Sequence, residues 1–204
     1  MNKTDYFIDI FRKAELKYGL VEKRLAAEGW DYPWQTLLAT IMSAQSRDET
    51  TIPIAENLFA KYSDLPSLAH AKYSDVLKVF RSLNYNKTKA RNVIDTAKML
   101  LGQYDGQVPD TIEELIVLPG VGRKTANLII TEVFDKEGIC VDTHVHRISN
   151  VFGFVKTNNP SETEFALREV VPRQYWSRIN RIFVLWGKDV PGRDKQKLLT
   201  ALNK

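Results

Sequence analysis

Residues 118–127 read Leu-Pro-Gly-Val-Gly-Arg-Lys-Thr-Ala-Asn, and this stretch decides the fold. Apolar spacing predicts a short helix over Ile112 to Val117, which the proline and two glycines then interrupt. A second helix is expected from about Arg123 to Phe134. The sequence therefore predicts a helix, a tight hairpin and a second helix over residues 112–134.

The hairpin has the features of an anion-binding site. Glycine permits positive φ and close approach of another molecule, here at Gly120 and Gly122. The first amides of the following helix lack intrahelical partners and lie at the positive end of its dipole. A DNA phosphate fits such a site at Gly120, Val121 and Gly122, with Arg123 adding a charge-assisted contact. Taken alone, Gly-x-Gly indicates an ordinary helical connection equally well.

Lys124 and Asp142 are candidates for the chemistry. Lys124 is expected in the first turn of the second hairpin helix, where the dipole disfavours its protonated form. A neutral amine is a nucleophile suited to Schiff-base formation at a sugar C1′, although most lysines are simply solvated. Asp142 precedes a predicted helix and is a good N-cap. A capping carboxylate is held rigidly, so it can also stabilise cationic character at C1′.

The rest of the chain has helical apolar spacing, and strand-like alternation is scarce. Ile139 to Val141 is the one short run that suits extended backbone. Pro53 is expected to start a helix afresh after Thr50 and Thr51. We predict an all-α protein of roughly nine to eleven helices, with its four tryptophans in core or hinge positions.

Composition narrows the class of protein. The 204 residues are 44% hydrophobic and carry a net charge of +4, which mildly favours a polyanionic partner. Cys140 is the only cysteine, so an intrachain disulfide and a cysteine-ligated zinc or iron–sulfur centre are excluded. No apolar run approaches the roughly 20 residues of a membrane span, and no secretory signal is visible. We expect a cytoplasmic protein, nucleoid-associated if the source is prokaryotic.

The ten-residue string and Val141-Asp-Thr-His144 together resemble the helix-hairpin-helix (HhH-GPD) DNA glycosylase superfamily, within it most closely endonuclease III. Weaker support comes from Ser43-Ala-Gln45 and from the segment Asn84 to Ala90, and the resemblance covers about residues 25–155. It implies a two-lobed, all-α fold. A six-helix barrel over 22–134 would carry the hairpin, and residues 1–21 plus 135–204 would form a second helical domain.

The resemblance implies a bifunctional DNA glycosylase and AP lyase of base excision repair. Lys124 would attack C1′ with help from Asp142, an oxidised pyrimidine such as thymine glycol would depart, and the imine would permit β-elimination of the 3′ phosphate. The partner would be double-stranded DNA with a damaged base or an abasic site, bound by a monomer across the cleft between the two lobes.

The resemblance also implies DNA-binding roles. Gln45 would fill the space left by the extruded base, and Tyr85 would part the opposite strand. Lys89 would border the same DNA face. His144 and His146 are two residues apart, which does not suit a shared metal on a helix, so hydrogen bonding or a phosphate contact by His144 is expected.

No cofactor is expected, apart from a monovalent cation. By resemblance, the carbonyls of Ile116, Leu118 and Val121 are candidates to hold Na⁺ or K⁺ next to a phosphate. Endonuclease III usually ends in four cysteines that hold a [4Fe–4S] cluster, and residues 186–197 contain none, so the second domain has no cluster loop. In the family the cluster loop also touches DNA. Arg193, Lys195 and Lys197 would either supply positive charge in place of that contact or form a mobile basic tail.

Two alternatives remain open. The base removed could be a mismatched thymine or uracil, an alkylated purine or 8-oxoguanine, because the pocket decides this. The wedge segment has Asn84 where the family often has Gly and Asn86 where it often has an aromatic residue, which bears on the lesion preference. The chain could also be a non-catalytic hairpin module that only grips phosphate.

Overall fold

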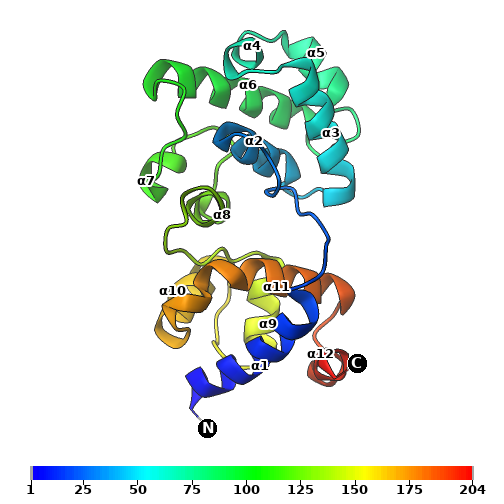
Figure 1. Ribbon diagram of the computed structural model, residues 1–204, viewed down its shortest axis with the longest axis vertical. Coiled ribbons are helices and arrows are strands. Elements are labelled where there is room, and N and C mark those ends of the chain that lie inside the picture. Colours follow the sequence, from blue (N-terminus) through cyan, green and yellow to red (C-terminus); the bar gives the residue numbers. More distant parts are fainter. Residues whose placement is uncertain (1, 204) are drawn as a thin grey trace. The chain divides into compact units, whose positions relative to one another are not determined.

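The structure is a computed structural model that describes residues 2–203. Over these residues it contains twelve α-helices, one short 3₁₀ helix (η1) and no strand, which confirms the all-α class. The helices are, in order, α1 (Lys3–Tyr18), α2 (Pro33–Ser43), α3 (Asp48–Lys61), α4 (Leu65–Ala69), α5 (Tyr73–Val79), α6 (Asn86–Gln103), α7 (Ile112–Leu115), α8 (Arg123–Phe134), α9 (Thr143–Val151), α10 (Pro160–Val170), η1 (Arg173–Tyr175), α11 (Trp176–Asp189) and α12 (Lys195–Leu202) (Figure 1).

Two expectations about helices were wrong. The predicted nine to eleven α-helices are too few, because the five-residue α4 contains a proline and α12 follows a Pro-Gly turn. Short or interrupted apolar patterns of this kind give a weak helical signal. Pro53 does not begin a helix either. It lies inside α3, which starts at Asp48 after a residue with extended backbone.

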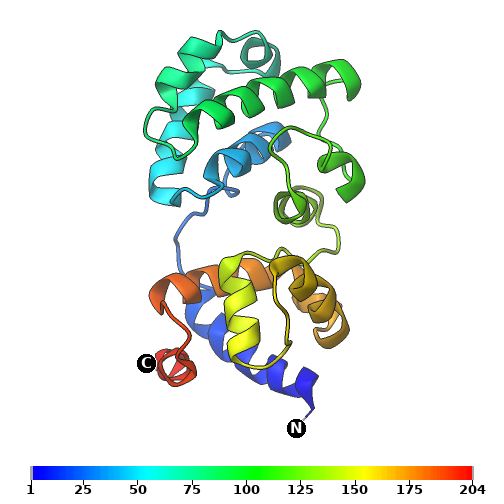
Figure 2. The same cartoon turned by 180° about the vertical axis from the view of Figure 1, so that it is seen from behind.

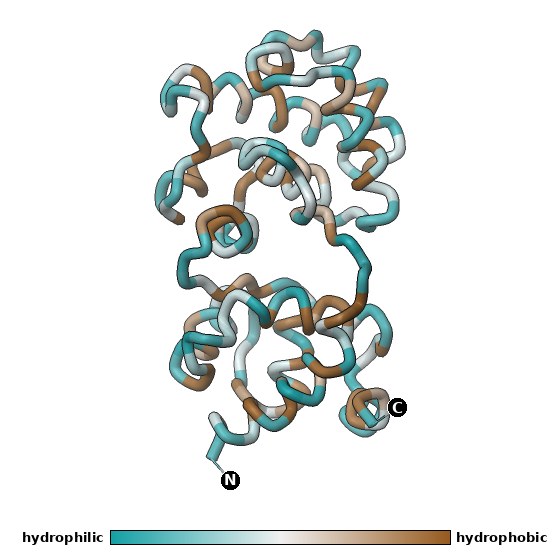
Figure 3. The backbone as a smooth tube through the Cα atoms, in the orientation of Figure 1, coloured by the Kyte–Doolittle hydropathy of each residue, from teal (hydrophilic) through white to brown (hydrophobic). Residues whose placement is uncertain are grey.

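The chain forms two compact units. One comprises Arg24–Phe134, and the other combines the residues up to 23 with those from 135 onward. Hydrophobic and hydrophilic stretches alternate along the helices of each unit (Figure 3), as amphipathic packing requires. No helix of the described chain has both the length and the apolar character that crossing a membrane requires.

The unit Arg24–Phe134 is built around α2. This helix packs against α3, α6 and α8 (Figure 1), and every residue from Trp34 to Met42 is buried. A helix that is buried all round needs apolar residues on every face, and α2 supplies them. Trp34 meets Phe59 edge to face with ring centroids 5.3 Å apart. The first helix of the unit is thereby fixed in its core.

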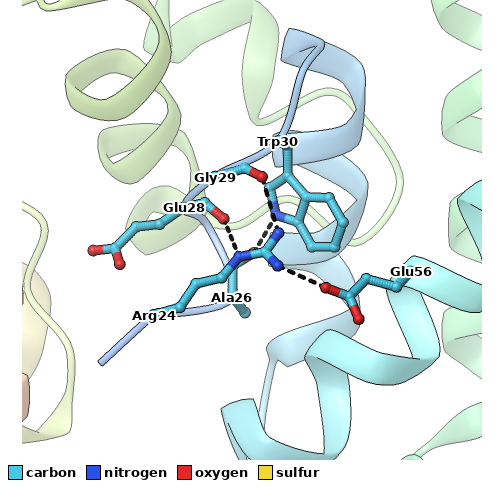
Figure 4. Close-up of polar contacts among 6 residues, drawn as sticks. All are labelled: Arg24, Ala26, Glu28, Gly29, Trp30 and Glu56. Atoms are coloured by element: carbon cyan, nitrogen blue, oxygen red, sulfur yellow. Dashed lines mark hydrogen bonds and ion pairs between the residues drawn. The ribbon is translucent and has the colours of Figure 1, made fainter. Parts of the chain in front are cut away.

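A polar hub at Arg24 fixes the entry of the chain into this unit (Figure 4). Its guanidinium lies 4.2 Å from the ring centroid of Trp30 and donates to the carbonyls of Glu28 (2.7 Å) and Gly29 (3.0 Å). It also pairs with Glu56 of α3 at 2.7 Å. Stacking and a planar fork of donors are specific to arginine, so one side chain shapes this turn and ties it to α3.

The other unit has an aromatic core. Its helices α9 and α11 pack together (Figure 2), with α10 against α9 and α1 against α11. Neighbouring rings lie 5.2–5.7 Å apart in several pairs, among them Phe7–Phe154, Phe11–Tyr175, Phe152–Trp186 and Phe183–Trp186. Trp176 and Trp186 are buried. Such aromatic pairs add to the stabilisation that burial of their area provides.

Arg147 of α9 organises the end of α11 and the segment that follows it. Its guanidinium donates to the carbonyls of Gly187 (2.9 Å), Val190 (3.2 Å) and Gly192. One carbonyl from the last turn of α11 and two from the loop that follows it thus converge on a single cation, and charge-assisted bonds of this kind are the stronger ones. The loop from 190 to 192 is therefore held by a side chain, in a chain with a single cysteine.

The segment after this loop is helical. The idea of a mobile basic tail is wrong for residues 195–202, since α12 contacts α1 and buries Leu198. The Lys195 side chain has a structural role of its own. Its Nζ lies 5.3 Å from the ring centroid of Tyr6 and 5.5 Å from that of Phe152. These cation–π contacts tie α12 to the aromatic core.

We predict that Arg147→Ala lowers the free energy of unfolding by about 2 kcal/mol, because three carbonyls lose a charged donor. Arg147→Lys should recover less than half of this loss, since an ammonium lacks the planar fork. Urea denaturation checks both variants, with the exposed Arg193→Ala as the control. A loss in Arg147→Ala no larger than that of the control would contradict the organising role.

Candidate active site

The hairpin between α7 and α8 is fixed by buried apolar anchors. Leu115, Leu118 and Val121 are buried, and the amides of Leu118 and Val121 close successive turns on the carbonyls of Leu115 and Leu118 at 3.1 and 3.0 Å. At the start of α7 the side chain of Thr111 accepts the amide of Glu114, as its capping-box spacing predicts. Every third residue from 115 to 121 is thus buried, which anchors the hairpin in the core of its unit.

Gly120 is the point at which the hairpin backbone meets α6. Its φ is +80°, and a Cβ built there would lie 2.6 Å from Nδ2 of Asn92 and 3.1 Å from Cβ of the same residue. Thr96, one turn further along α6, donates to the carbonyl of Pro119 at 3.0 Å. Asn92 and Thr96 share one helix face by their spacing, but no sequence pattern marks the hairpin as their partner.

Gly122 and Lys124 lie on the open side of the hairpin. A Cβ built on Gly122 would meet nothing within 4 Å, so another molecule can reach its backbone. Lys124 is exposed in the first turn of α8, and Arg123 is partly exposed beside it. The predicted second hairpin helix, Arg123 to Phe134, is found with those bounds.

Asp142 caps α9, as predicted. Its Oδ1 accepts the backbone amides of His144 at 2.9 Å and Val145 at 2.8 Å. Both bonds use the same oxygen, so Oδ2 is not part of the cap. A carboxylate with one oxygen fixed by two amides is oriented by the backbone and needs no side-chain partner to hold it.

His144 packs closely on α11. A Cβ at Gly187 would lie 2.4 Å from its Nδ1, so only glycine allows the ring to take this position. Burial lowers the pKa of His144, although the charge of Asp142 acts in the opposite direction. The imidazole is therefore neutral at neutral pH, and it can serve a phosphate only as a hydrogen-bond donor. His146 instead makes a 2.7 Å hydrogen bond with Thr163.

Gln45 and Tyr85 share an unusual backbone conformation. Both have positive φ, 53° for Gln45 and 56° for Tyr85, and neither is a residue type that favours this region. Each such residue costs on the order of 1–3 kcal/mol unless its surroundings hold it. Both are exposed, Tyr85 to 66%. They follow α2 and precede α6 within the same unit.

Lys89, which is expected to border the DNA face, is buried and bonded to the segment that follows α2. It is 4% exposed, and its Nζ donates to Oγ of Ser46 at 2.8 Å. Burial lowers its pKa to about 8. The neighbouring Asn84 donates from Nδ2 to the carbonyl of Gln45 at 2.7 Å. Both bonds join segments about 40 residues apart, which sequence reasoning did not foresee.

Comparison with known proteins agrees with this geometry. Residues 38–173 match the model of the HhH-GPD superfamily of base excision DNA repair proteins. The chain belongs to this superfamily. Endonuclease III of Thermotoga maritima is 41% identical over 158 residues, which span 78% of this HhH-GPD chain and 74% of the relative. Endonuclease III of Synechocystis is 35% identical over 78% of this chain and 73% of its own.

Solved structures show the same fold. A trapped endonuclease III–DNA covalent intermediate superimposes with a TM-score of 0.84 at 29% identity, over 93% of this chain and 87% of that one. A non-covalent endonuclease III–DNA complex gives 0.84 at 26% identity over the full length of both. This HhH-GPD protein is an endonuclease III-like base excision repair DNA glycosylase, and endonuclease III homologues are bifunctional glycosylases and AP lyases. The predicted family is thereby confirmed.

The described residues bear on a metal or cluster site in two ways. Within residues 2–203, no three or more His, Cys, Asp or Glu side chains group as metal ligands. The buried Cys140 cannot by itself hold a four-cysteine cluster.

We predict that Gly120→Ala lowers the free energy of unfolding by about 2 kcal/mol, because the new Cβ would meet Asn92 and the residue would keep a positive φ. Gly122→Ala is the matched control, since its Cβ meets nothing, and it should change stability by less than about 0.5 kcal/mol. Chemical denaturation of both variants checks this. Equal losses in the two variants would contradict the packing argument.

We also predict a pH dependence from Lys89. Its folded pKa, about 8, lies below the ordinary lysine value of 10.5, so the unfolded chain binds more protons between these values. The cost of burying the charged amine is fully present below pH 8 and is relieved as pH rises towards 10.5. From pH 7 to pH 10, wild type should therefore gain about 2 kcal/mol relative to Lys89→Met. Urea denaturation at both pH values checks this, and a constant difference would contradict it.

Proposed function

We propose that this chain removes oxidised pyrimidines from duplex DNA and then cleaves the strand 3′ to the abasic site. The observation that carries the proposal is the position of Lys124, exposed in the first turn of α8 directly after the glycine hairpin. An amine at this point can reach a sugar whose phosphate is held by the hairpin amides. The likeness to endonuclease III structures with DNA supports the same reaction.

The proposed steps use Lys124 as nucleophile. Its neutral amine attacks C1′, the C1′–N bond breaks, and the base leaves with the electron pair and takes up a proton. Ring opening gives an imine between Lys124 and C1′. Loss of a C2′ proton then breaks the C3′–O bond and expels the 3′ phosphate, and water hydrolyses the imine to release the amine.

Asp142 is proposed as the carboxylate that assists this reaction. Its Oδ1 is held by two amides of α9, which leaves Oδ2 outside the cap. Oδ2 would stabilise cationic character at C1′ as the base departs, or accept the proton of the attacking amine.

The hairpin is proposed as the phosphate site, together with a monovalent cation. In the described hairpin, the carbonyls of Ile116 and Val121 accept no backbone hydrogen bond, and that of Leu118 accepts one. Carbonyls with free lone pairs suit Na⁺ or K⁺, so these residues fit the ion that the family implies. The ion would bring positive charge next to the phosphate, and the exposed backbone of Gly122 would approach it directly.

Gln45 and Tyr85 are proposed to enter the stacked bases of the duplex when the damaged base is extruded. Extruding a base leaves a gap, and Gln45 is exposed at the end of α2 where it can fill this gap and bond the orphaned base. Tyr85 presents an exposed ring that can enter between bases of the opposite strand. We propose that the unit 24–134 supplies this wedge, the hairpin and Lys124, which are the barrel functions expected of residues 22–134.

The test is borohydride trapping on two duplexes, one with a single thymine glycol and one with a single abasic site. Wild type should form a covalent adduct with both, and Lys124→Ala should form at least about 100-fold less, because the imine needs the amine. Lys98→Ala is the matched control, since Lys98 is an exposed lysine elsewhere in the same unit.

Each outcome has a distinct meaning. An adduct with the abasic duplex alone would keep the lyase and contradict the choice of oxidised pyrimidine. Normal trapping by Lys124→Ala would contradict the assignment of the nucleophile. No trapping by wild type on either duplex would contradict the lyase activity.

A further inference from the structure

The two exposed residues that the proposed function places in the DNA stack are joined to each other by a polar bridge. Asn84 directly precedes Tyr85, and its Nδ2 donates to the carbonyl of Gln45 at 2.7 Å. Lys89, one turn after Tyr85, donates from Nζ to Oγ of Ser46, the residue after Gln45, at 2.8 Å. Residues on both sides of Tyr85 are thus bonded to the adjacent pair Gln45 and Ser46.

This bridge explains how two strained residues can coexist on an exposed surface. Gln45 and Tyr85 both adopt the left-handed backbone region, which a flexible loop of these residue types would leave. Local hydrogen bonds hold each loop: the amide of Ser46 donates to the carbonyl of Ser43 at 2.9 Å, and that of Lys89 to the carbonyl of Tyr85 at 3.0 Å. These local bonds do not fix the distance between the loops, and the Asn84 and Lys89 bonds do.

The two bonds differ in their surroundings. Lys89 is buried, so its bond to Ser46 belongs to the interior that supports the loops. Asn84 is exposed next to Tyr85, so its bond lies on the surface that meets DNA. Asn84 stands where the family often has glycine, and glycine has no side chain with which to make this bond.

We propose that Asn84 is a positioning residue that fixes Gln45 relative to Tyr85, so that the gap-filling and strand-parting side chains enter DNA as one preformed wedge. This inference rests on the proposed function of Gln45 and Tyr85. Asn84 acts through the backbone of Gln45 and need not touch DNA. Preorganisation of this kind lowers the ordering cost at the moment of base extrusion. It speeds removal of a paired base and leaves the later chemistry at Lys124 unchanged.

The bridge itself is tested in the free protein by amide hydrogen exchange of residues 44–47. In Asn84→Ala the exchange rate of this segment should rise by about tenfold, because opening of the segment no longer breaks the hydrogen bond between residue 84 and the carbonyl of Gln45. Asn57→Ala, an exposed asparagine of α3, is the matched control and should stay within about twofold of wild type. Unchanged exchange in Asn84→Ala would overturn the proposal. This measurement needs no turnover, so it tests the Asn84 bridge even if wild type releases no base. A failure of wild type to release base would count against the proposed function and not against the bridge.

The functional part is tested by a double-mutant cycle on single-turnover base release from a thymine glycol duplex. Asn84→Ala should slow release by about tenfold in the wild-type background and by less than about twofold in the Gln45→Ala background, because residues that act through one another are not additive. Multiplicative losses would mean that Asn84 contacts DNA independently, and no loss in the wild-type background would mean that it positions nothing. Either result overturns the proposal.

A second substrate separates positioning from chemistry. Trapping of Asn84→Ala on a single-stranded abasic oligonucleotide should equal that of wild type, because no opposite strand has to be parted there. A loss on this substrate equal to the loss on the duplex would place the defect at the reacting sugar and overturn the assignment.

Discussion

The contact between the hairpin backbone and α6 at Gly120 is the constraint on which the proposed DNA-binding surface depends. Because Gly120 has no Cβ, Asn92 can lie against its backbone, and Thr96 holds the adjacent carbonyl of Pro119. The same helix begins after Tyr85 and sends Lys89 to Ser46. One rigid helix therefore sets the spacing between the wedge and the hairpin, about 16 Å from Tyr85 to Thr96 along its axis. A change at either contact would alter that spacing for both.

The second constraint concerns the unit that lacks a cluster. A cluster fixes its loop through covalent ligation, whereas here Arg147 gathers the carbonyls of Gly187, Val190 and Gly192. The close approach of His144 to Gly187 holds the last turn of α11, from which this loop leaves, against α9. Arg147 and His144 lie on α9, and Asp142 caps the same helix. Ordering of the loop by hydrogen bonds thus also steadies the residue proposed for catalysis.

The hairpin and the cap were predictable from sequence because their causes are local. Proline, glycine and the residues that follow them determine α8 within ten positions, and an aspartate before a helix determines its own cap. The Asn84 and Lys89 bonds span 39 and 43 residues and involve ordinary polar side chains, so no pattern marks them. Lys89 shows the consequence: the family resemblance implied that it borders the DNA face, and no sequence pattern marked its burial or its bond to Ser46. Arg147 was missed for the same reason, since a carbonyl acceptor has no sequence signature.

Separate parts of the molecule serve chemistry and recognition in the proposed function. Lys124 and Asp142 provide an amine and a carboxylate that any base bound to C1′ would meet, so they do not select the lesion. Selection requires that one base leave the stack more readily than others, and this depends on how well the wedge fits the distorted duplex. The departures from the family pattern, Asn84 and Asn86, lie in that wedge, and Asn84 joins its two sides. A chain that changes these residues while it keeps the hairpin, Lys124 and Asp142 retains its reaction and changes how it finds its substrate.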